Sequence, residues 1–260
     1  MDAVVIAGGI PQPDEPLYPF TQGLPKALVD ICGKPMVQWV LDALEKAESI
    51  DQIVIVGLSP ECNLKSNKIR DYADNQGSIL LNIRIGVERV QKFNPQARHV
   101  AIVSADIPAI LPDQVNWVVN TAMQSDQDVY YNVIERKVME QRFPGSKRSY
   151  TRLKDVEVCG GDLNVVRASA VTGRDALWDR IIASRKNVFK QAALIGYDTL
   201  FLLLFRQITL AGAVSMVAKR IHLTGQALVC PYAEVGMDVD KPFQLEIMRA
   251  ELNKRAQSGG

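Results

Sequence analysis

The amino-acid sequence predicts an α/β protein built on a doubly wound, mostly parallel β-sheet, with a hairpin and a helical insertion in its second half. The chain has 260 residues, of which 47% are hydrophobic and 23% charged, so it can bury a large core. Short runs rich in Val and Ile alternate with longer stretches in which apolar residues recur at helical spacing. This alternation is typical of strands joined by crossover helices, which form parallel sheets.

The first apolar run, residues 3–6, predicts a buried strand that ends at Gly8 and Gly9, where backbone can approach a ligand closely. Pro35 then opens a helix over residues 36–48, because proline suits the first helical turn. The elements expected next are strand 52–57, a polar helix within 66–75, a strand near 79–83, helix 87–93, strand 99–104, helix 111–125 and strand 128–134.

From residue 135 the chain becomes polar, basic and rich in turn residues, and we expect a hairpin within residues 143–155 that lies over the site. Its basic side chains either meet a phosphate or form a solvated surface. These side chains are Lys147, Arg148, Arg152 and Lys154. The elements expected after the hairpin are helices 174–184, 190–205 and 209–220, with Thr209 as a helix N-cap, then strand 227–230 and helix 243–256. We predict a single domain over residues 1–260, with a hairpin and helical lobe at 135–225 within it.

The composition limits the possible partners. A formal net charge of +1 gives no general attraction to nucleic acid or to anionic membranes. The four cysteines form no C-x-x-C pair, so neither a zinc site nor a disulfide framework is expected. Asp198 and Arg206 interrupt the apolar stretch 192–218 before it reaches the roughly 20 residues that span a bilayer, which leaves a buried helix or a membrane-surface element. No secretory signal pattern opens the chain, which favours a cytoplasmic protein, and a homo-oligomer stays open.

The opening of the chain contains a specific series of motifs. The N–H groups of a glycine turn can hold a phosphate, and Lys26 would add a positive charge, although a glycine pair alone is also an ordinary tight turn. The longer pattern resembles the nucleotidyltransferases of the MobA-like and sugar-phosphate type, which open with A-G-G, then P-L-T-x-x-x-P-K, then G-K-P and an apolar residue. The counterparts here are Ala7-Gly8-Gly9, residues 19–26 ending in Pro25-Lys26, and Gly33-Lys34-Pro35-Met36.

Two aspartates follow strand-like segments at matching points of the same pattern. Asp106 stands in Ser-Ala-Asp-Ile-Pro after strand 99–104, and Asp240 stands in Met-Asp-Val-Asp-Lys-Pro near the end of the chain. Taken alone, each aspartate fits a turn or helix cap as well as a ligand. The resemblance implies that both hold Mg²⁺. It further implies catalytic roles for Lys26, Asp106 and Asp240, and nucleotide binding by Ala7, Gly8, Gly9 and Lys26.

Two further loops bear on the binding of substrates. Gly160, Gly161 and Asp162 resemble a glycine-containing family loop that lines the acceptor pocket, which implies acceptor binding and makes 135–225 the acceptor-side lobe. The loop after Gly9 departs from the family, which carries G-x-R there. Residues 10–16 contain two acids and no arginine, so Lys26 or a more distant basic residue must supply the charge.

The predicted function is Mg²⁺-dependent transfer of a nucleoside monophosphate from an NTP to a phosphorylated small-molecule acceptor, with release of pyrophosphate. Two alternatives stay open, a nucleotide-binding or regulatory module with little or no turnover, and a metal-dependent glycosyltransferase of the same fold. Glycosyltransferases normally carry D-x-D at the central strand, and Ser104 stands where its first aspartate would be. The chain lacks the G-x-G-x-x-G of a dinucleotide-dependent oxidoreductase after its first strand. A P-loop NTPase requires serine or threonine after the lysine, and here Pro35 follows Lys34. The base and the acceptor are not determined by the sequence.

Overall fold

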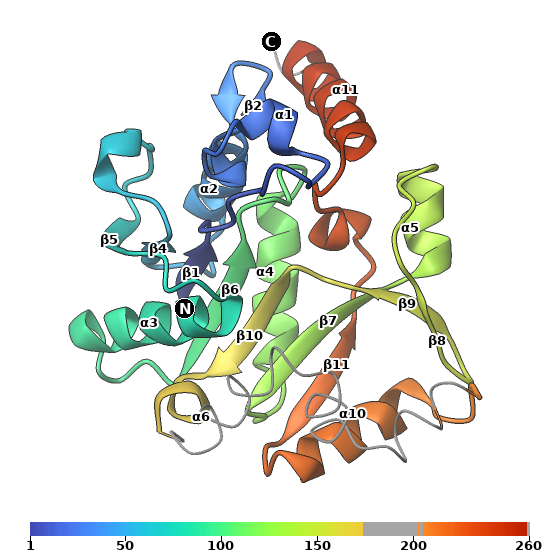
Figure 1. Ribbon diagram of the computed structural model, residues 1–260. Helices are drawn as coiled ribbons and strands as arrows, with labels where there is room; N and C mark the ends of the chain where they lie inside the picture. The colour runs from blue at the N-terminus through green and yellow to red at the C-terminus, as the bar shows by residue number, and fades with distance from the viewer. Residues whose placement is uncertain (174–201, 203–204, 259–260) are drawn as a thin grey trace.

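A nine-stranded sheet forms the centre of the molecule in a computed structural model that describes residues 1–173, 202 and 205–258 (Figure 1). The strands run in the order β5-β4-β1-β6-β10-β7-β9-β8, and β11 pairs with β7. Their bounds are β1 Asp2–Ile6, β4 Ile53–Val56, β5 Ile69–Ala73, β6 His99–Ser104, β7 Val129–Glu135, β8 Thr151–Arg152, β9 Glu157–Gly160, β10 Leu163–Arg167 and β11 Gly225–Val229. A separate two-stranded ribbon joins β2 (Asp30–Ile31) to β3 (Lys34–Pro35).

The sheet has a parallel half and a mixed half. Strands β5, β4, β1 and β6 are parallel neighbours, and Val4 of β1 lies opposite Val54 of β4 and Ile102 of β6. All three side chains are buried, as expected for strands covered on both faces, which explains their uninterrupted apolar runs. Strand β10 then runs antiparallel between β6 and β7, while β11 is parallel to β7. The predicted doubly wound, mostly parallel α/β fold is confirmed.

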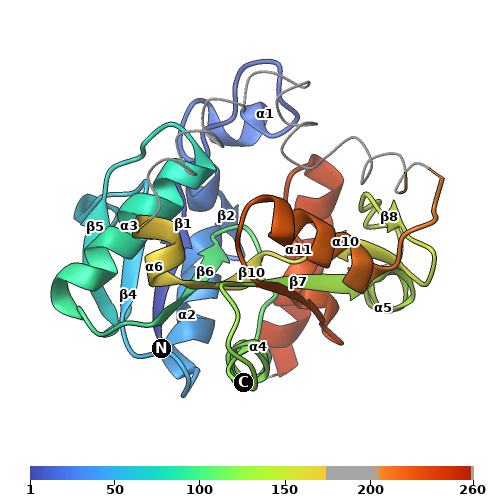
Figure 2. The ribbon, with the colours of Figure 1, turned by 90° about the horizontal axis from the view of Figure 1, so that it is seen from below.

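Helices cover both faces of the sheet (Figure 2). One face carries α2 (Met36–Lys46), α4 (Pro112–Ala122) and α11 (Pro242–Ser258), which share the largest apolar cluster with β1, β4 and β6. The other face carries α3 (Ile79–Phe93) and α6 (Ala168–Thr172) over the parallel half, and α10 (Leu210–Arg220) over β7 and β11. Shorter helical elements are α1 Tyr18–Thr21, η1 Lys26–Leu28, η2 Pro60–Cys62, α5 Arg136–Arg142 and η3 Ala233–Gly236.

Two of the expected elements are wrong, and they adjoin each other. The polar helix predicted within 66–75 is the strand β5, an edge strand in which Arg70 is exposed and Asp71 is half-buried. The strand near 79–83 and the short helix 87–93 are one helix, α3, whose N-cap Ser78 accepts a hydrogen bond from the Leu81 N–H. The first residues of α3 are a continuous apolar run, which resembles a buried strand. The buried positions that repeat at helical spacing come only later in the helix.

The other elements predicted for the described residues agree with the structure to within a few residues, including α10 with its N-cap Thr209. The hairpin expected within 143–155 lies slightly later, in β8 and β9, after the unpredicted helix α5. The helix expected at 174–184 and most of that expected at 190–205 lie outside the described residues. All four cysteines are free. Within the described parts of the chain, no helix has both the length and the apolar character needed to cross a membrane.

The glycine loop after β1 is packed against the end of β4. Gly57 has a φ of +97°, and a Cβ atom placed there would lie 2.2 Å from the Cα atom of Gly8. Only glycine fits such a position, since both the backbone angle and the space exclude a side chain. Gly57 therefore sets how closely the loop containing Gly8 approaches the neighbouring strand.

We expect Gly57→Ala to lower the free energy of unfolding by about 2–4 kcal/mol, because it adds a backbone clash to the cost of a left-handed alanine. Gly23→Ala is the matched control, since Gly23 has a φ of +87° but nothing within 4 Å of the added atom. It should cost only about 1–2 kcal/mol. Urea denaturation of the two variants measures the difference, and equal losses would contradict the crowding at Gly57.

Candidate active site

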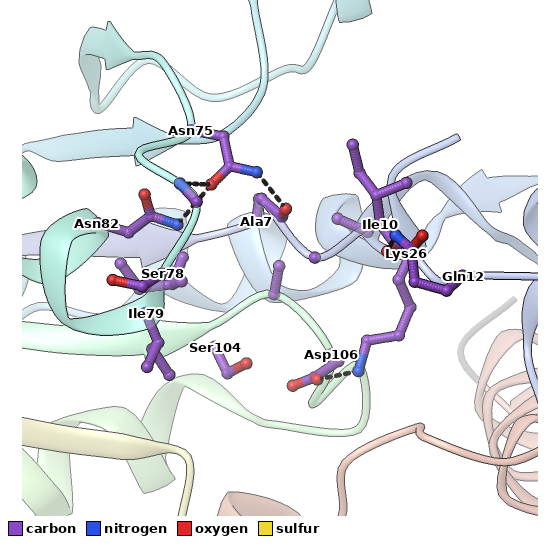
Figure 3. Close-up of a pocket in the computed structure, with 16 residues that line it drawn as sticks. Ala7, Ile10, Gln12, Lys26, Asn75, Ser78, Ile79, Asn82, Ser104 and Asp106 are labelled. Carbon is purple, nitrogen blue, oxygen red and sulfur yellow. Dashed lines mark hydrogen bonds and ion pairs between the residues drawn. The ribbon is translucent and has the colours of Figure 1, made fainter. Parts of the chain in front are cut away.

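The carboxyl ends of the parallel strands open into a cavity of about 500 Å³ (Figure 3). The end of β1 contributes Ala7 to Gly9, and the end of β6 contributes Ser104 to Asp106. Another wall is formed by Asn75 and Ser78, between β5 and α3, and by Asn82 in the first turn of α3. This position agrees with the general rule that ligands of α/β sheets bind beyond the carboxyl ends of the strands.

Lys26 joins two acidic side chains that come from distant parts of the chain. Its N–H donates to the Gly9 carbonyl at 2.8 Å, which fixes η1 against the glycine loop. Its Nζ lies 2.6 Å from Oδ2 of Asp106 and 2.6 Å from Oδ1 of Asp240. The Val239 N–H donates to the Asp106 carbonyl at 3.0 Å, so the two acidic segments are also tied through the backbone. The structure thus brings together the lysine and the two aspartates that the sequence singled out.

The charges at this point are strongly coupled. Burial by itself would lower the pKa of Lys26, but the negative charges of Asp106 and Asp240 outweigh it and raise the pKa above its ordinary value. The ammonium therefore stays charged and occupies the position on which both carboxylates converge. The other oxygen of Asp106, Oδ1, is buried and has no hydrogen-bond partner among the described residues. This oxygen can accept a further cation or donor.

The two glycines of the loop have different surroundings. An added Cβ at Gly8 would lie 2.8 Å from Cγ of Asn75, whose side-chain amide donates to the Gly8 carbonyl at 2.6 Å. An added Cβ at Gly9 would meet nothing within 4 Å, so Gly9 borders open space in the cavity. Asn75 also accepts hydrogen bonds from the Gly77 N–H and from Asn82, which orders this wall of the cavity.

Sequence analysis missed Asn75 and Asn82 as cavity residues, because it assigned the wrong elements to residues 66–83. The available signal was the run Asn-Gln-Gly-Ser before an apolar stretch, which is typical of a turn followed by an N-cap. With α3 recognised, this turn would have been placed beyond β5, beside the glycine loop.

Asp162 lies at the same edge of the sheet, just before β10. Its backbone N–H donates to the Val235 carbonyl and its carbonyl accepts from the Ser104 N–H, both at 2.8 Å. Burial raises the pKa of the Asp162 carboxyl to about 7, and the nearby charge of Asp106 contributes in the same direction. Asp162 therefore belongs to the same electrostatic cluster as Asp106, and Gly160 and Gly161 immediately precede it.

Arg148 is a second, half-buried cation beside this cluster. Its guanidinium forms an ion pair with Asp238, and one of its terminal nitrogens lies 3.8 Å from Oδ2 of Asp162. Arg148 Nε and Asp162 Oδ2 have no hydrogen-bond partner among the described residues. Two other basic residues of the predicted hairpin point elsewhere, Arg152 to Glu157 and Lys147 to the ring of Phe243.

The start of α11 connects the Asp240 segment to the loop that carries Arg148. Oε1 of the buried Gln244 accepts hydrogen bonds at 2.9 Å from the N–H groups of Asp240 and Lys241, so the Asp240 carboxylate is not needed as a helix cap. The Gln244 amide nitrogen donates to the Ser146 carbonyl at 3.3 Å. One side chain thus holds both the Asp240 backbone and the loop that carries Arg148.

A lysine and two aspartates gathered beyond the ends of parallel strands, beside a glycine loop, place the chain among α/β proteins with a ligand site at this edge of the sheet. A family model described as the MobA-like NTP transferase domain matches residues 3–171, and the chain belongs to that family of nucleotidyltransferases.

Solved structures and curated proteins agree with this assignment. A structure described as a hypothetical transferase from Thermus thermophilus is 32% identical, with a TM-score of 0.80, and the match covers 94% of this chain and 98% of that one. A 4-diphosphocytidyl-2C-methyl-D-erythritol synthase structure from Anaerococcus prevotii shares the fold, with 13% identity, a TM-score of 0.59, and coverage of 97% and 95%. The bifunctional protein GlmU of Caldanaerobacter subterraneus subsp. tengcongensis is 29% identical over 129 residues, which are 49% of this chain. The match spans about a quarter, 26%, of the GlmU chain.

We expect Lys26→Met to destabilise the protein by about 1–3 kcal/mol, because it leaves Asp106 and Asp240 without their cation. The loss stays below that of a fully buried pair since the Asp240 side chain is 55% exposed. Added Mg²⁺ should raise the melting temperature of this variant more than that of the wild type.

Thermal melts with and without Mg²⁺ provide the measurement. Lys34→Met is the control, because it removes a more exposed ion pair with Asp42. It should cost less than about 1 kcal/mol and give the same Mg²⁺ response as the wild type. A Mg²⁺ effect of equal size in both variants would show that the two carboxylates do not attract a cation specifically.

The raised pKa of Asp162 predicts a pH dependence of stability. The folded protein holds this proton up to about pH 7, whereas an unfolded aspartate releases it near 3.8, so stability falls as pH rises across that window. The slope is at most about 1.4 kcal/mol per pH unit for one proton. In melts from pH 4 to 8, Asp162→Asn should lose this downward slope, and an unchanged slope would assign it to other groups.

Proposed function

We propose that this protein transfers a nucleoside monophosphate from an NTP to a phosphorylated small-molecule acceptor and releases pyrophosphate. The observation that supports this most directly is the convergence of Asp106 and Asp240 on one cation position beside the glycine loop. Transfer between phosphates concentrates negative charge at phosphorus, so the protein must supply cations and alignment rather than a covalent nucleophile.

The nucleotide fits the 500 Å³ cavity in one orientation better than in the other. The end bordered by Gly8, Gly9 and Lys26 offers backbone and an ammonium group, which suit phosphates. The end farthest from Lys26 offers Ser78 and the exposed Ile79, which suit a nucleoside. Phosphates would therefore lie at the end that carries Lys26.

The residues present fit a magnesium ion. Asp106 and Asp240 contribute carboxylate oxygens, including the unpaired Asp106 Oδ1, and phosphate and water oxygens would complete the octahedral set that Mg²⁺ requires. Among the described residues no group of three or more potential ligand side chains is preassembled, which agrees with a site completed by substrate. When bound, the ion would neutralise phosphate charge and polarise the reacting phosphorus.

Basic residues on the other side of Lys26 could supply the positive charge that the family's loop arginine provides. A second cavity of about 480 Å³ is lined by Lys26, Asp240 and Lys241, together with the loop at Ile10 and Pro11. Lys241 stands where the resembling family more often has threonine, and its side chain is exposed. Glu15 also lines this cavity, where it accepts a hydrogen bond from the Gln12 N–H, so the two lysines must outweigh its charge. We assign Lys26 and Lys241 to the outer phosphates.

The acceptor would approach from the lobe at 135–225. Gly160, Gly161 and Asp162 border its path, and Arg148 supplies the cation for its phosphate. In the reaction, an oxygen of the acceptor phosphate forms a bond to the α-phosphorus while the bond to the leaving pyrophosphate breaks. No general base is required, because a phosphate oxygen is already ionised. Lys26 neutralises the charge that develops on the transferred and leaving phosphates.

The second candidate is a nucleotide-binding module with little turnover, favoured by the absence of arginine from residues 10–16. Thermal-shift measurements with each NTP, with and without Mg²⁺, test binding. Pyrophosphate release with an acceptor panel tests turnover. Stabilisation by a nucleotide without pyrophosphate release under any condition would favour the module. Release of a nucleoside diphosphate from a nucleotide sugar, with no pyrophosphate release from any NTP, would favour the glycosyltransferase.

We expect Asp106→Asn and Asp240→Asn each to lower Mg²⁺-dependent pyrophosphate release at least about a hundredfold, because each keeps the side-chain size but removes a carboxylate. Asp126→Asn is the control. Asp126 is 57% exposed and pairs with Arg98 and Arg167 away from the cavity, so turnover should stay within about twofold. Unchanged rates in the Asp106 and Asp240 variants would remove both residues from the site.

A further inference from the structure

We propose that an apolar pocket beneath α10 binds a hydrocarbon group of the acceptor, so that the acceptor is an alkyl or prenyl phosphate rather than a sugar phosphate. This inference rests on the proposed transfer reaction and names the acceptor class for it. The pocket has a volume of about 400 Å³ and lies between α10 and the sheet strands β7, β8, β9 and β11.

The walls of this pocket are almost entirely apolar. Helix α10 contributes Leu210, Val214 and Val217, and the sheet contributes Val133 and Val158. No residue of α10 is fully buried, although the helix lies over the sheet, so the helix leaves room between itself and the strands. A hydrocarbon chain in this space would be removed from water, which is the main source of affinity for such a group.

The polar residues at the pocket wall are mostly engaged with other partners. The Gln226 side chain accepts a hydrogen bond from the Ser125 hydroxyl at 2.8 Å, and the Thr224 hydroxyl accepts one from the Asp128 N–H at 2.9 Å. A sugar or polyol placed here would find few free partners for its hydroxyl groups, and burying them unpaired costs free energy. The pocket therefore selects against hydroxylated acceptors.

The pocket extends toward the acceptor end of the active site, since Tyr131, Cys159 and Gly160 line it and Gly160 belongs to the loop that carries Asp162. Gly160 is two residues before Asp162, and the Tyr131 hydroxyl lies 2.4 Å from where a Gly160 Cβ would be. Burial raises the pKa of Tyr131, and the charge of Asp162 raises it further, which agrees with their proximity. The Tyr131 side chain is 48% exposed, as expected for a residue at an open boundary.

The two ends of this path match a phosphate with an apolar tail. Arg148 lies at one end with an unpartnered buried Nε, and the apolar pocket lies at the other. A phosphate beside Arg148 could remain next to Asp106 and the nucleotide, while its hydrocarbon chain extends past Gly160 under α10. The arrangement accounts for both a half-buried cation and an apolar wall on the acceptor side.

Isothermal titration of the whole protein with ethyl, butyl, hexyl and octyl phosphate tests the proposal, with glycerol 3-phosphate as the polar probe. Affinity should rise by up to about fourfold per methylene, since each buried CH₂ contributes ~0.8 kcal/mol. Hexyl phosphate should bind at least about tenfold more tightly than ethyl phosphate, and glycerol 3-phosphate should bind no better than ethyl phosphate. Equal affinities across the series would overturn the proposal.

Ala213→Phe fills the pocket from α10 and should reduce the advantage of hexyl over ethyl phosphate to less than about threefold. Ala211→Phe, on the exposed side of the same helix, is the matched control and should leave the series unchanged. If Ala213→Phe lowers the melting temperature substantially, Ala218→Leu provides a smaller obstruction in the same pocket. A chain-length dependence that survives both pocket variants would place the hydrocarbon elsewhere and overturn the assignment.

Pyrophosphate release with each alkyl phosphate, NTP and Mg²⁺ separates this proposal from the proposed function. Transfer that shows no preference for longer chains would support the function and overturn the pocket assignment. Chain-length-dependent binding that Ala213→Phe abolishes, without pyrophosphate release from any NTP, would support the pocket and overturn the transfer reaction.

Discussion

The contact on which the site depends is the pair of ion bridges made by Lys26. They connect residues that are 80 and 214 positions apart in the chain, so they form only after β1, β6 and the segment before α11 have come together. Without a cation between them, Asp106 and Asp240 would repel each other in a partly buried position. The arrangement that stabilises the folded chain therefore directs two carboxylates toward one point. A divalent cation, with a higher charge than the lysine ammonium, would bind to oxygen ligands that are already positioned.

The sheet divides the site into two sides with different backbone geometry. On the parallel side, consecutive strands deliver their carboxyl ends to one edge, which brings the glycine loop, Asn75 and Asp106 around the cavity. On the other side, β10 runs antiparallel, so the residues that reach this edge are those before its start. This reversal of direction places Asp162 beside Asp106, and it separates the proposed nucleotide side from the proposed acceptor side.

Much of the fold was predictable, because strands buried on both faces have continuous apolar runs and the helices between them keep their spacing. The same reasoning failed at β5, where an exposed edge permits polar residues, and at the apolar first turn of α3. Lys26, Asp106 and Asp240 could be singled out because they follow recognisable strand ends or motifs. The pairing of Arg148 with Asp238 could not, since it depends on how a turn-rich segment packs against a loop 90 residues later, and local sequence carries no record of that packing.

The amide of Gln244 has a mechanical consequence. Its oxygen holds the backbone of Asp240, while its nitrogen holds the carbonyl of Ser146, two residues before Arg148. One side chain therefore ties the two segments together through hydrogen bonds at its two ends. A movement of the loop at Ser146 would be felt at the backbone of Asp240, so the acceptor side is coupled to the geometry of the cation position.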